Sequence, residues 1–124
     1  MVIRLTLFLL FLSTLPTPLA QAAGEAGFKS IFNGHDLSGW SGNDKFWSVE
    51  DGAITGRTTK DNPTPSNTFL IWTQGEVDDF ELKLNYRIVG GNSGIQYRSN
   101  DLGNHVVQGH QADFEAGDVW SGAH

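Results

Sequence analysis

The chain has 124 residues, a formal net charge of −6, 15 glycines and no cysteine. The lack of cysteine excludes disulfides, thiol catalysis and cysteine-ligated metal sites. Its Lys and Arg residues are scattered through an acidic sequence and leave no electrostatic footprint for nucleic acid, so we expect no nucleic-acid partner.

Residues 1–22 differ from the rest of the chain and predict a secretory signal peptide. A basic start at Arg4 precedes an apolar run over residues 5–15, which two prolines end, and an Ala-Gln-Ala run closes at Ala22. The apolar run is too short to span a bilayer and no second one follows, so we expect no membrane span. A bacterial lipoprotein needs a cysteine at its cleavage site. We therefore expect an unanchored secreted or periplasmic protein.

Residues 23–124 are predicted to form one all-β domain, because several stretches alternate between apolar and polar residues and none keeps a helical period. Residues 46–50 and 53–57 flank Asp51-Gly52, a dipeptide that suits the positive φ angles of a tight turn. This pattern predicts a β-hairpin. A short apolar strand is expected at residues 68–73.

The clearest alternation covers residues 80–88, where apolar side chains occupy the even positions. It predicts a strand with one buried and one solvated face. A turn at 90–94 leads to a strand at 95–98, and a polar loop at 99–104 precedes a last strand at about 106–115. Short strands with glycine turns between them favour an antiparallel jelly-roll sandwich.

Polar side chains gather on the last two predicted strands. If the apolar side chains of these strands face the core, the opposite face carries Gln96, Arg98, Gln111, Asp113 and Glu115. Residues two apart on a strand lie about 6.5–7 Å apart. Two carboxylates at that separation, near an arginine, can have split pKa values and perform acid–base chemistry. The alternative is a set of ordinary solvated side chains on an exposed sheet.

Other features give weaker candidates. Asn92, in an Asn-Ser-Gly turn, can orient a ligand or only serve the turn. Trp120, in a Gly-Asp-Val-Trp-Ser-Gly segment, can offer a flat face to a sugar. His105 and His110 are five apart across a glycine and could ligate a metal, but solvent-exposed histidines are the favoured interpretation. We therefore expect no metal site.

Two family resemblances bear on function. The weaker one is to laminarinase-type β-glucanases, which are jelly rolls whose catalytic strand reads Glu-x-Asp-x-(x)-Glu. The segment Gln-Ala-Asp-Phe-Glu ending at Glu115 keeps that alternation, but Gln111 stands where those enzymes have their nucleophile. Because glutamine cannot form the glycosyl-enzyme ester, retaining hydrolysis by that route is not expected.

The stronger resemblance is to the 3-keto-disaccharide hydrolase family and covers nearly all of residues 23–124. Five segments occur in the family's order: Phe-Asn-Gly-His-Asp-Leu-Ser-Gly-Trp ending at Trp40, Trp-Ser-Val-Glu-Asp-Gly-Ala-Ile-Thr-Gly from Trp47, Asp-Phe-Glu-Leu-Lys-Leu from Asp79, Gly-Asn-Ser-Gly-Ile-Gln-Tyr-Arg ending at Arg98, and Gln-Ala-Asp-Phe-Glu ending at Glu115. The resemblance implies a concanavalin-like jelly roll that cleaves glycosides already oxidised at C3. Members continue beyond a Tyr/Trp-Ser-Gly segment, here at Trp120, so the chain is expected to be the N-terminal part of the domain. Such an incomplete sandwich would expose unpaired edges and an uncovered apolar face.

The chemistry that the resemblance implies needs a base, an acid and a partner for an enolate. A carbonyl at C3 acidifies the C2 hydrogen, so a base can remove it, the C1 leaving group departs, and water then adds. Asp113 or Glu115 is the candidate base and Arg98 the candidate enolate stabiliser. The candidates for binding the oligosaccharide or 3-keto-glycoside are Asn92, Gln96, Gln111 and Trp120. No cofactor is assigned. The alternative is a non-catalytic carbohydrate-binding module, because the same sandwich also serves as a lectin.

Overall fold

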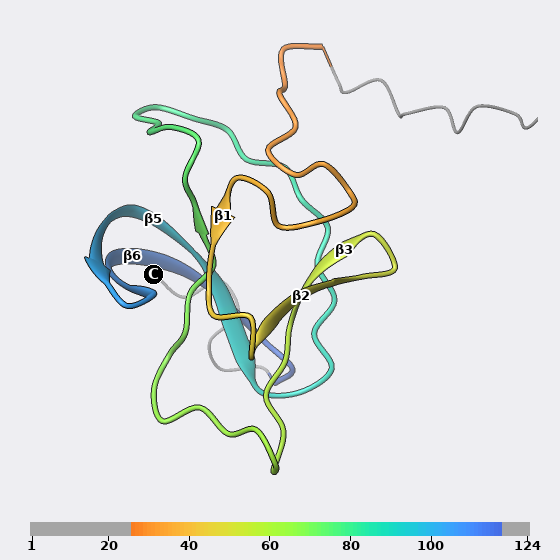
Figure 1. The fold of residues 1–124 in the computed structure, drawn as a ribbon. Helices are drawn as coiled ribbons and strands as arrows, with labels where there is room; N and C mark the ends of the chain where they lie inside the picture. The colour runs from red at the N-terminus through yellow and green to blue at the C-terminus, as the bar shows by residue number, and fades with distance from the viewer. Residues whose placement is uncertain (1–25, 118–124) are drawn as a thin grey trace, which may run out of the picture. The chain divides into compact units, whose positions relative to one another are not determined.

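The computed structural model describes residues 26–117. Its contacts divide the chain into residues 1–30 and residues 31–124. The described residues of the first unit include a turn at Ala26 and Gly27, and the second unit holds all the described strands (Figure 1). The predicted signal peptide lies outside the described residues.

In the described part of the chain, six strands pair into three antiparallel two-stranded sheets. β1 (Trp40–Ser41) pairs with β4 (Ile71–Trp72), β2 (Trp47–Glu50) with β3 (Ala53–Gly56), and β5 (Asn92–Gly103) with β6 (Val106–Glu115). No residue between 26 and 117 is helical. This part of the chain is therefore all-β and antiparallel, as the alternation predicted. The predicted strand at 68–73 is shorter, at Ile71–Trp72, and β1 was not predicted.

Both hairpins close on two-residue turns with positive φ angles. Asp51 and Gly52, between β2 and β3, have φ of 50° and 74°, and Asn104 and His105, between β5 and β6, have 54° and 59°. Turns of this kind match the right-handed twist of paired strands. The first turn was predicted, whereas the expected polar loop at 99–104 is wrong. β5 continues to Gly103, and the tip of the hairpin is exposed, including the side chain of Leu102.

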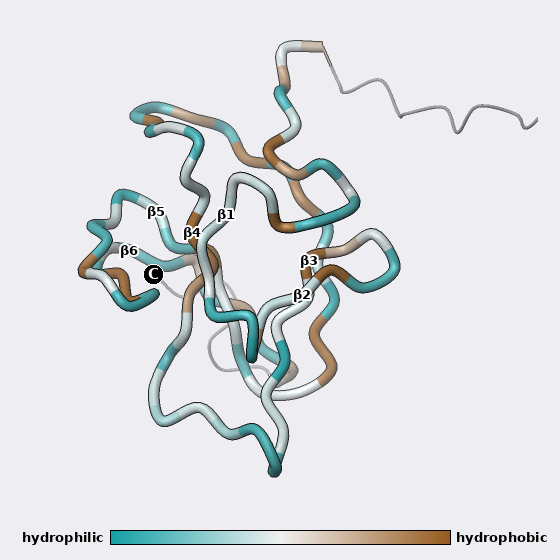
Figure 2. The backbone as a smooth tube through the Cα atoms, viewed as in Figure 1, coloured by the Kyte–Doolittle hydropathy of each residue, from teal (hydrophilic) through white to brown (hydrophobic). Residues whose placement is uncertain are grey.

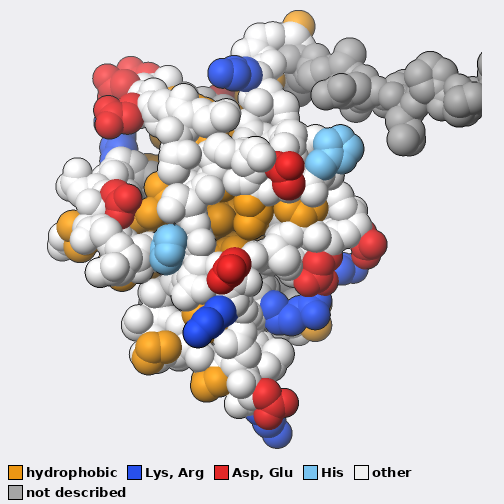
Figure 3. Space-filling view, in the orientation of Figure 1, with side chains coloured by type: hydrophobic (Ala, Val, Ile, Leu, Met, Phe, Trp, Pro, Cys, Tyr) orange, Lys and Arg blue, Asp and Glu red, His pale blue; other side chains and the backbone are white. Residues whose placement is uncertain are grey.

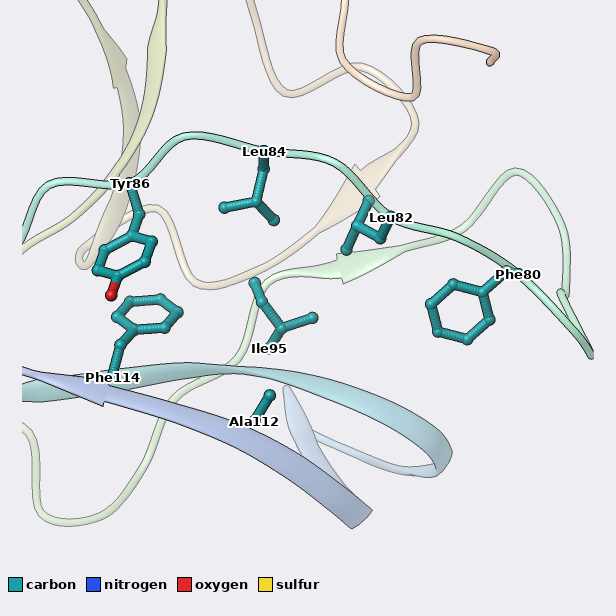
Figure 4. Close-up of a pocket in the computed structure, with 7 residues that line it drawn as sticks. All are labelled: Phe80, Leu82, Leu84, Tyr86, Ile95, Ala112 and Phe114. Carbon is teal, nitrogen blue, oxygen red and sulfur yellow. The ribbon is translucent and has the colours of Figure 1, made fainter. Parts of the chain in front are cut away.

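Residues 80–88 alternate as predicted but are not paired into a sheet, so the predicted strand is wrong. Figure 2 shows hydrophobic and hydrophilic residues following one another along this segment. A strand requires a ladder partner, and alternation reports only which side chains share a face. Apolar side chains of this segment do share one face (Figure 4). Four of them, together with three side chains of β5 and β6, line a groove of about 360 Å³. The residues from the segment are Phe80, Leu82, Leu84 and Tyr86, and those from the two strands are Ile95, Ala112 and Phe114.

The apolar groove is partly open to solvent. Tyr86 and Phe114 stack at its end, with ring centroids 4.2 Å apart and ring planes 22° apart. Leu82 is nevertheless 42% exposed and Leu84 47%, and no hydrophobic side chain between residues 26 and 117 is fully buried. Figure 3 shows hydrophobic side chains open to solvent at several places on one face. In the same residues, no helix has the length and apolar character needed to cross a membrane.

Candidate functional site

The polar face of the β5–β6 hairpin is the candidate site; it consists of Asn92, Gln96, Gln111, Asp113 and Glu115. In the ladder, Gln96 lies opposite Gln111, Gly94 opposite Asp113, and Asn92 opposite Glu115. Directly paired residues of antiparallel strands point to the same face, and alternate residues of one strand share it. Because Ile95 and Ala112 point into the apolar groove (Figure 4), the polar face lies on the other side of the hairpin. The register agrees with the expectation that Gln96, Gln111, Asp113 and Glu115 share a face, whereas Arg98, which was expected with them, lies at a register shift and pairs elsewhere.

Side-chain hydrogen bonds connect four residues into what we call the amide chain: Ser99, Gln96, Gln111 and Asp113. Gln96 Nε2 donates to Gln111 Oε1 at 3.0 Å, and Gln111 Nε2 donates to Asp113 Oδ1. Ser99 Oγ lies 2.9 Å from Gln96 Oε1 and also 2.9 Å from the Tyr97 carbonyl oxygen. All four members of the amide chain are half-buried.

The amide chain has one consistent direction. An ionised Asp113 can only accept hydrogen bonds, so Gln111 must present its NH₂ group to it. Gln111 Oε1 then faces Gln96, which must present its own NH₂ group in turn. Gln96 Oε1 is left facing Ser99, whose hydroxyl can donate to it. The two amide donors therefore both point toward Asp113, and the Ser99 hydroxyl can donate either to Gln96 Oε1 or to the Tyr97 carbonyl oxygen.

Gly94 makes room for this arrangement. A Cβ atom at Gly94 would lie 2.7 Å from Cγ of Gln111 and 2.8 Å from the carbonyl oxygen of Ala112. The side chain of Gln111 thus lies over the backbone of Gly94, directly opposite Asp113. Its reach toward the carboxylate depends on the absence of a side chain at this position.

The two carboxylates of the polar face occupy the end of β6. Asp113 accepts the hydrogen bond from Gln111, and Glu115 lies opposite the exposed Asn92. Just beyond them, the amide of Ala116 donates to the carbonyl of Gly91 at 3.0 Å. This bond continues the pairing past both strand ends and holds the two carboxylates on an ordered ladder.

Arg98 does not belong to the amide chain. Its φ is 47°, at a register shift between Tyr97 and Asn100, so β5 bulges at this residue. Its guanidinium pairs with Asp78 at 3.4 Å and with Asp79 at 3.2 Å, and all three side chains are mostly exposed. Among the described residues, Arg98 has no hydrogen bond to Asp113.

The two histidines do not lie together as metal ligands would. The carbonyl oxygen of His105, in the hairpin turn, accepts a hydrogen bond from the amide of Phe69 at 3.2 Å. The ring of His110 stacks on Tyr97, with centroids 5.7 Å apart. Between residues 26 and 117 there is no group of three or more His, Asp and Glu side chains that could hold a metal ion. Trp120 lies outside the described residues.

The polar residues of segment 32–40 stabilise their own loop. Asn33 Oδ1 accepts hydrogen bonds from the amides of His35 and Asp36, and Asp36 Oδ1 accepts from Asn33 Nδ2 at 2.7 Å and from the Ser38 amide at 2.8 Å. Hydrogen bonds from the Ser38 side chain, from Asn33 and from the Ser38 backbone lower the pKa of Asp36 from 3.8 to about 2. Segment 32–40 therefore carries structural side chains.

Ser99 is the site residue that the sequence pattern did not reveal. It follows the bulge at Arg98, and simple alternation would place it on the face opposite Gln96. The sequence feature that could have indicated this position is Gly109 on the neighbouring strand, because a Cβ there would lie 2.6 Å from Ser99 Cα. A register shift and a close backbone approach together bring Ser99 to Gln96.

Comparison with known proteins identifies the family. A family model described as 3-keto-alpha-glucoside-1,2-lyase-like domain matches residues 27–124. No curated protein and no solved structure matches the chain. The matched range includes all three sheets and the entire polar face, in line with the motifs that resemble the 3-keto-disaccharide hydrolases. The chain belongs to the family of 3-keto-alpha-glucoside-1,2-lyase-like domains.

Proposed function

We propose that this chain carries the base and part of the sugar-binding surface of a secreted hydrolase that cleaves 3-keto-glycosides. The observation that supports this most directly is a carboxylate, Asp113, held on an ordered sheet by an oriented amide donor. The family's description names a 1,2-lyase, which is the bond pattern of an elimination between C1 and C2. We further propose that the three sheets are parts of a concanavalin-like jelly roll.

The proposed reaction has two halves. Asp113 removes the proton from C2, which is acidic because it lies next to the C3 carbonyl, and the electron pair passes into the enolate at the C3 oxygen. The enolate collapses to a C1–C2 double bond, and the C1–O bond breaks as an acid protonates the departing oxygen. Water then adds at C1 and a proton returns to C2, which gives net hydrolysis without a change of oxidation state.

We assign the role of base to Asp113 because a hydrogen bond fixes the orientation of its carboxylate. Oδ1 accepts the hydrogen bond from Gln111, while Oδ2 has no hydrogen bond to any described residue. A base works when its acceptor oxygen is aimed at the proton and is not already occupied. We therefore assign the proton transfer to Oδ2 and give Glu115 the role of acid for the leaving oxygen.

The binding roles follow from what each side chain has left to offer. The amide nitrogens of Gln96 and Gln111 each use one proton within the amide chain and keep a second for a sugar hydroxyl. Asn92 is exposed at the edge of the same face. Arg98 makes exposed ion pairs, which stabilise a protein by only ~0–1 kcal/mol, so an enolate can compete for its guanidinium. Trp120 remains a proposed stacking platform.

The test is incubation of the protein with 3-keto-trehalose or 3-keto-sucrose and detection of free 3-keto-glucose. We expect release by the wild type and a loss of ~10²–10⁴-fold in Asp113→Asn, the usual contribution of a positioned base. Asp61→Asn is the matched control, because Asp61 is an exposed aspartate in the loop between β3 and β4. If the protein binds the sugar but neither the wild type nor any variant releases 3-keto-glucose, the result would favour the lectin alternative.

A further inference from the structure

We infer that Ser99 is a positioning residue, and that the amide chain from Ser99 through Gln96 and Gln111 sets the direction of the Asp113 carboxylate. The inference rests on the proposed function, because it assigns a role to residues behind the base. It also extends that function, since Gln96 and Gln111 then act on the base as well as on the sugar.

Hydrogen-bond complementarity orients the side-chain amides of Gln96 and Gln111. A glutamine amide can present either its oxygen or its nitrogen, and the choice at Gln111 decides whether Asp113 meets a donor or another acceptor. Gln96 Nε2, 3.0 Å from Gln111 Oε1, fixes the choice at Gln111. Ser99 supports the choice at Gln96, because its hydroxyl is the donor that faces Gln96 Oε1 among the described residues, and the Tyr97 carbonyl oxygen is the second acceptor for the same proton.

Ser99 and Gln111 are packed closely against the backbone of the neighbouring strand. A Cβ atom at Gly109 would lie 2.6 Å from Ser99 Cα and 2.7 Å from Ser99 Cβ, so Ser99 lies directly against the bare backbone of β6. At the other end of the chain, Gln111 lies over Gly94 in the same way. Two glycines on opposite strands thus hold the first and third members of the amide chain in place. Ordinary solvated side chains need no such clearance.

The chemical consequence concerns which carboxylate oxygen reacts. With Gln111 held as a donor, Oδ1 of Asp113 stays engaged and Oδ2 is presented to the substrate. Without Ser99, Gln96 Oε1 loses its donor, and the amide chain is held only at the Asp113 end, where the carboxylate accepts from Gln111. Gln96 and Gln111 would then be less firmly held, and Gln111 would orient Oδ1 of Asp113 less tightly. Ser99 touches no substrate and acts only through its neighbours.

The decisive variant is Ser99→Ala, with Ser93→Ala as its matched control. Ser93 lies on the same strand opposite Phe114, is exposed, and has no side-chain hydrogen bond to a described residue. Loss of one hydrogen bond in such a chain corresponds to about a three- to tenfold change. We expect Ser99→Ala to lower kcat by that factor and to leave KM within about twofold, with Ser93→Ala unchanged in both.

A second measurement does not depend on turnover. In Ser99→Ala, the side-chain amide NMR signals of Gln111 should shift and exchange faster with water, although Ser99 does not contact Gln111. The amide signals of Asn33, in the separate 32–40 loop, serve as the internal reference. Unchanged Gln111 signals together with unchanged kcat would overturn the inference while the proposed function stands. Altered Gln111 signals in a protein that releases no sugar would overturn the proposed function and leave the amide chain standing.

Discussion

Single side chains in this protein are oriented by short-range polar contacts. Asn33, Asp36 and Ser38 bind one another in the 32–40 loop, and Gln111 is aimed at Asp113 by its neighbours. In neither place is a side chain fully buried. Orientation at the residue scale therefore comes from hydrogen-bond complementarity and from the glycines beside it.

The pKa of Asp36 gives a prediction about pH. Because its pKa is lowered from 3.8 to about 2, the stability that this carboxylate contributes is fully present above pH ~4. It is lost as the pH falls through about 2. We expect the carboxyl ¹³C signal of Asp36 to titrate near pH 2. Ser38→Ala should move the midpoint up toward 3.8, because the hydrogen bond from the Ser38 side chain lowers the pKa of Asp36 more than any other contact. A midpoint that stays in place in Ser38→Ala would contradict this explanation.

Gly94 gives a second prediction at this scale. In Gly94→Ala the new Cβ would collide with the side chain of Gln111 and with the carbonyl oxygen of Ala112, so the ladder must shift. We expect a loss of ~1–3 kcal/mol in the free energy of unfolding, the usual cost of overpacking, and reduced turnover. Gly90→Ala is the control, since a Cβ there meets nothing within 4 Å. Equal denaturation midpoints for the two variants would count against close packing at Gly94.

At the scale of the elements, the two hairpins explain what the sequence could and could not predict. Asp51-Gly52 predicted the β2–β3 turn, because such a turn requires positive φ angles and these two residue types tolerate them. Alternation on β6 placed Gln111 and Asp113 on one face correctly. The bulge at Arg98 carries no comparable signal, so the sequence placed Arg98 with the carboxylates, whereas its side chain reaches Asp78 and Asp79.

The β2–β3 turn can be tested by substitution. Gly52 has a φ of 74°, which costs a residue with a Cβ ~1–2 kcal/mol. We therefore expect Gly52→Ala to lower the free energy of unfolding by about that amount in urea titrations. Asp51→Gly should raise the free energy of unfolding or leave it unchanged, because Asp51 already carries the strain of a φ of 50° and glycine adopts this φ without strain. A stabilising Gly52→Ala would show that the turn adopts another conformation in solution.

At the scale of the whole molecule, the apolar groove is the main departure from an ordinary globular protein. Segment 80–88 carries the alternation of a sheet strand, yet no ladder partner lies beside it in the described residues, and sequence alone cannot supply one. Leu82, Leu84 and Tyr86 remain between 42% and 58% exposed. An exposed apolar face of this kind is an association hazard.

This exposure predicts dye binding and self-association of the 124-residue protein. We expect it to enhance the fluorescence of 8-anilinonaphthalene-1-sulfonate and to scatter light increasingly with concentration, because both report accessible apolar surface. Leu84→Lys should reduce both signals, since it places a charge in the groove. Lys45→Gln, on an exposed residue outside the groove, is the control. Dye fluorescence that is indifferent to Leu84→Lys would show that the groove is covered in solution.

The division into three two-stranded sheets determines how the backbone hydrogen bonds open locally. Since no strand between residues 26 and 117 belongs to two sheets, the β2–β3 ladder can open without breaking a hydrogen bond of β5–β6, and the β5–β6 ladder can open without breaking one of β2–β3. Amide exchange with heavy water should then fall into separate classes, one for each hairpin, instead of one global class. The longer β5–β6 ladder should exchange most slowly, and the candidate catalytic carboxylate is attached to it. The residues that orient Asp113 would thus keep their geometry while other parts of the backbone exchange.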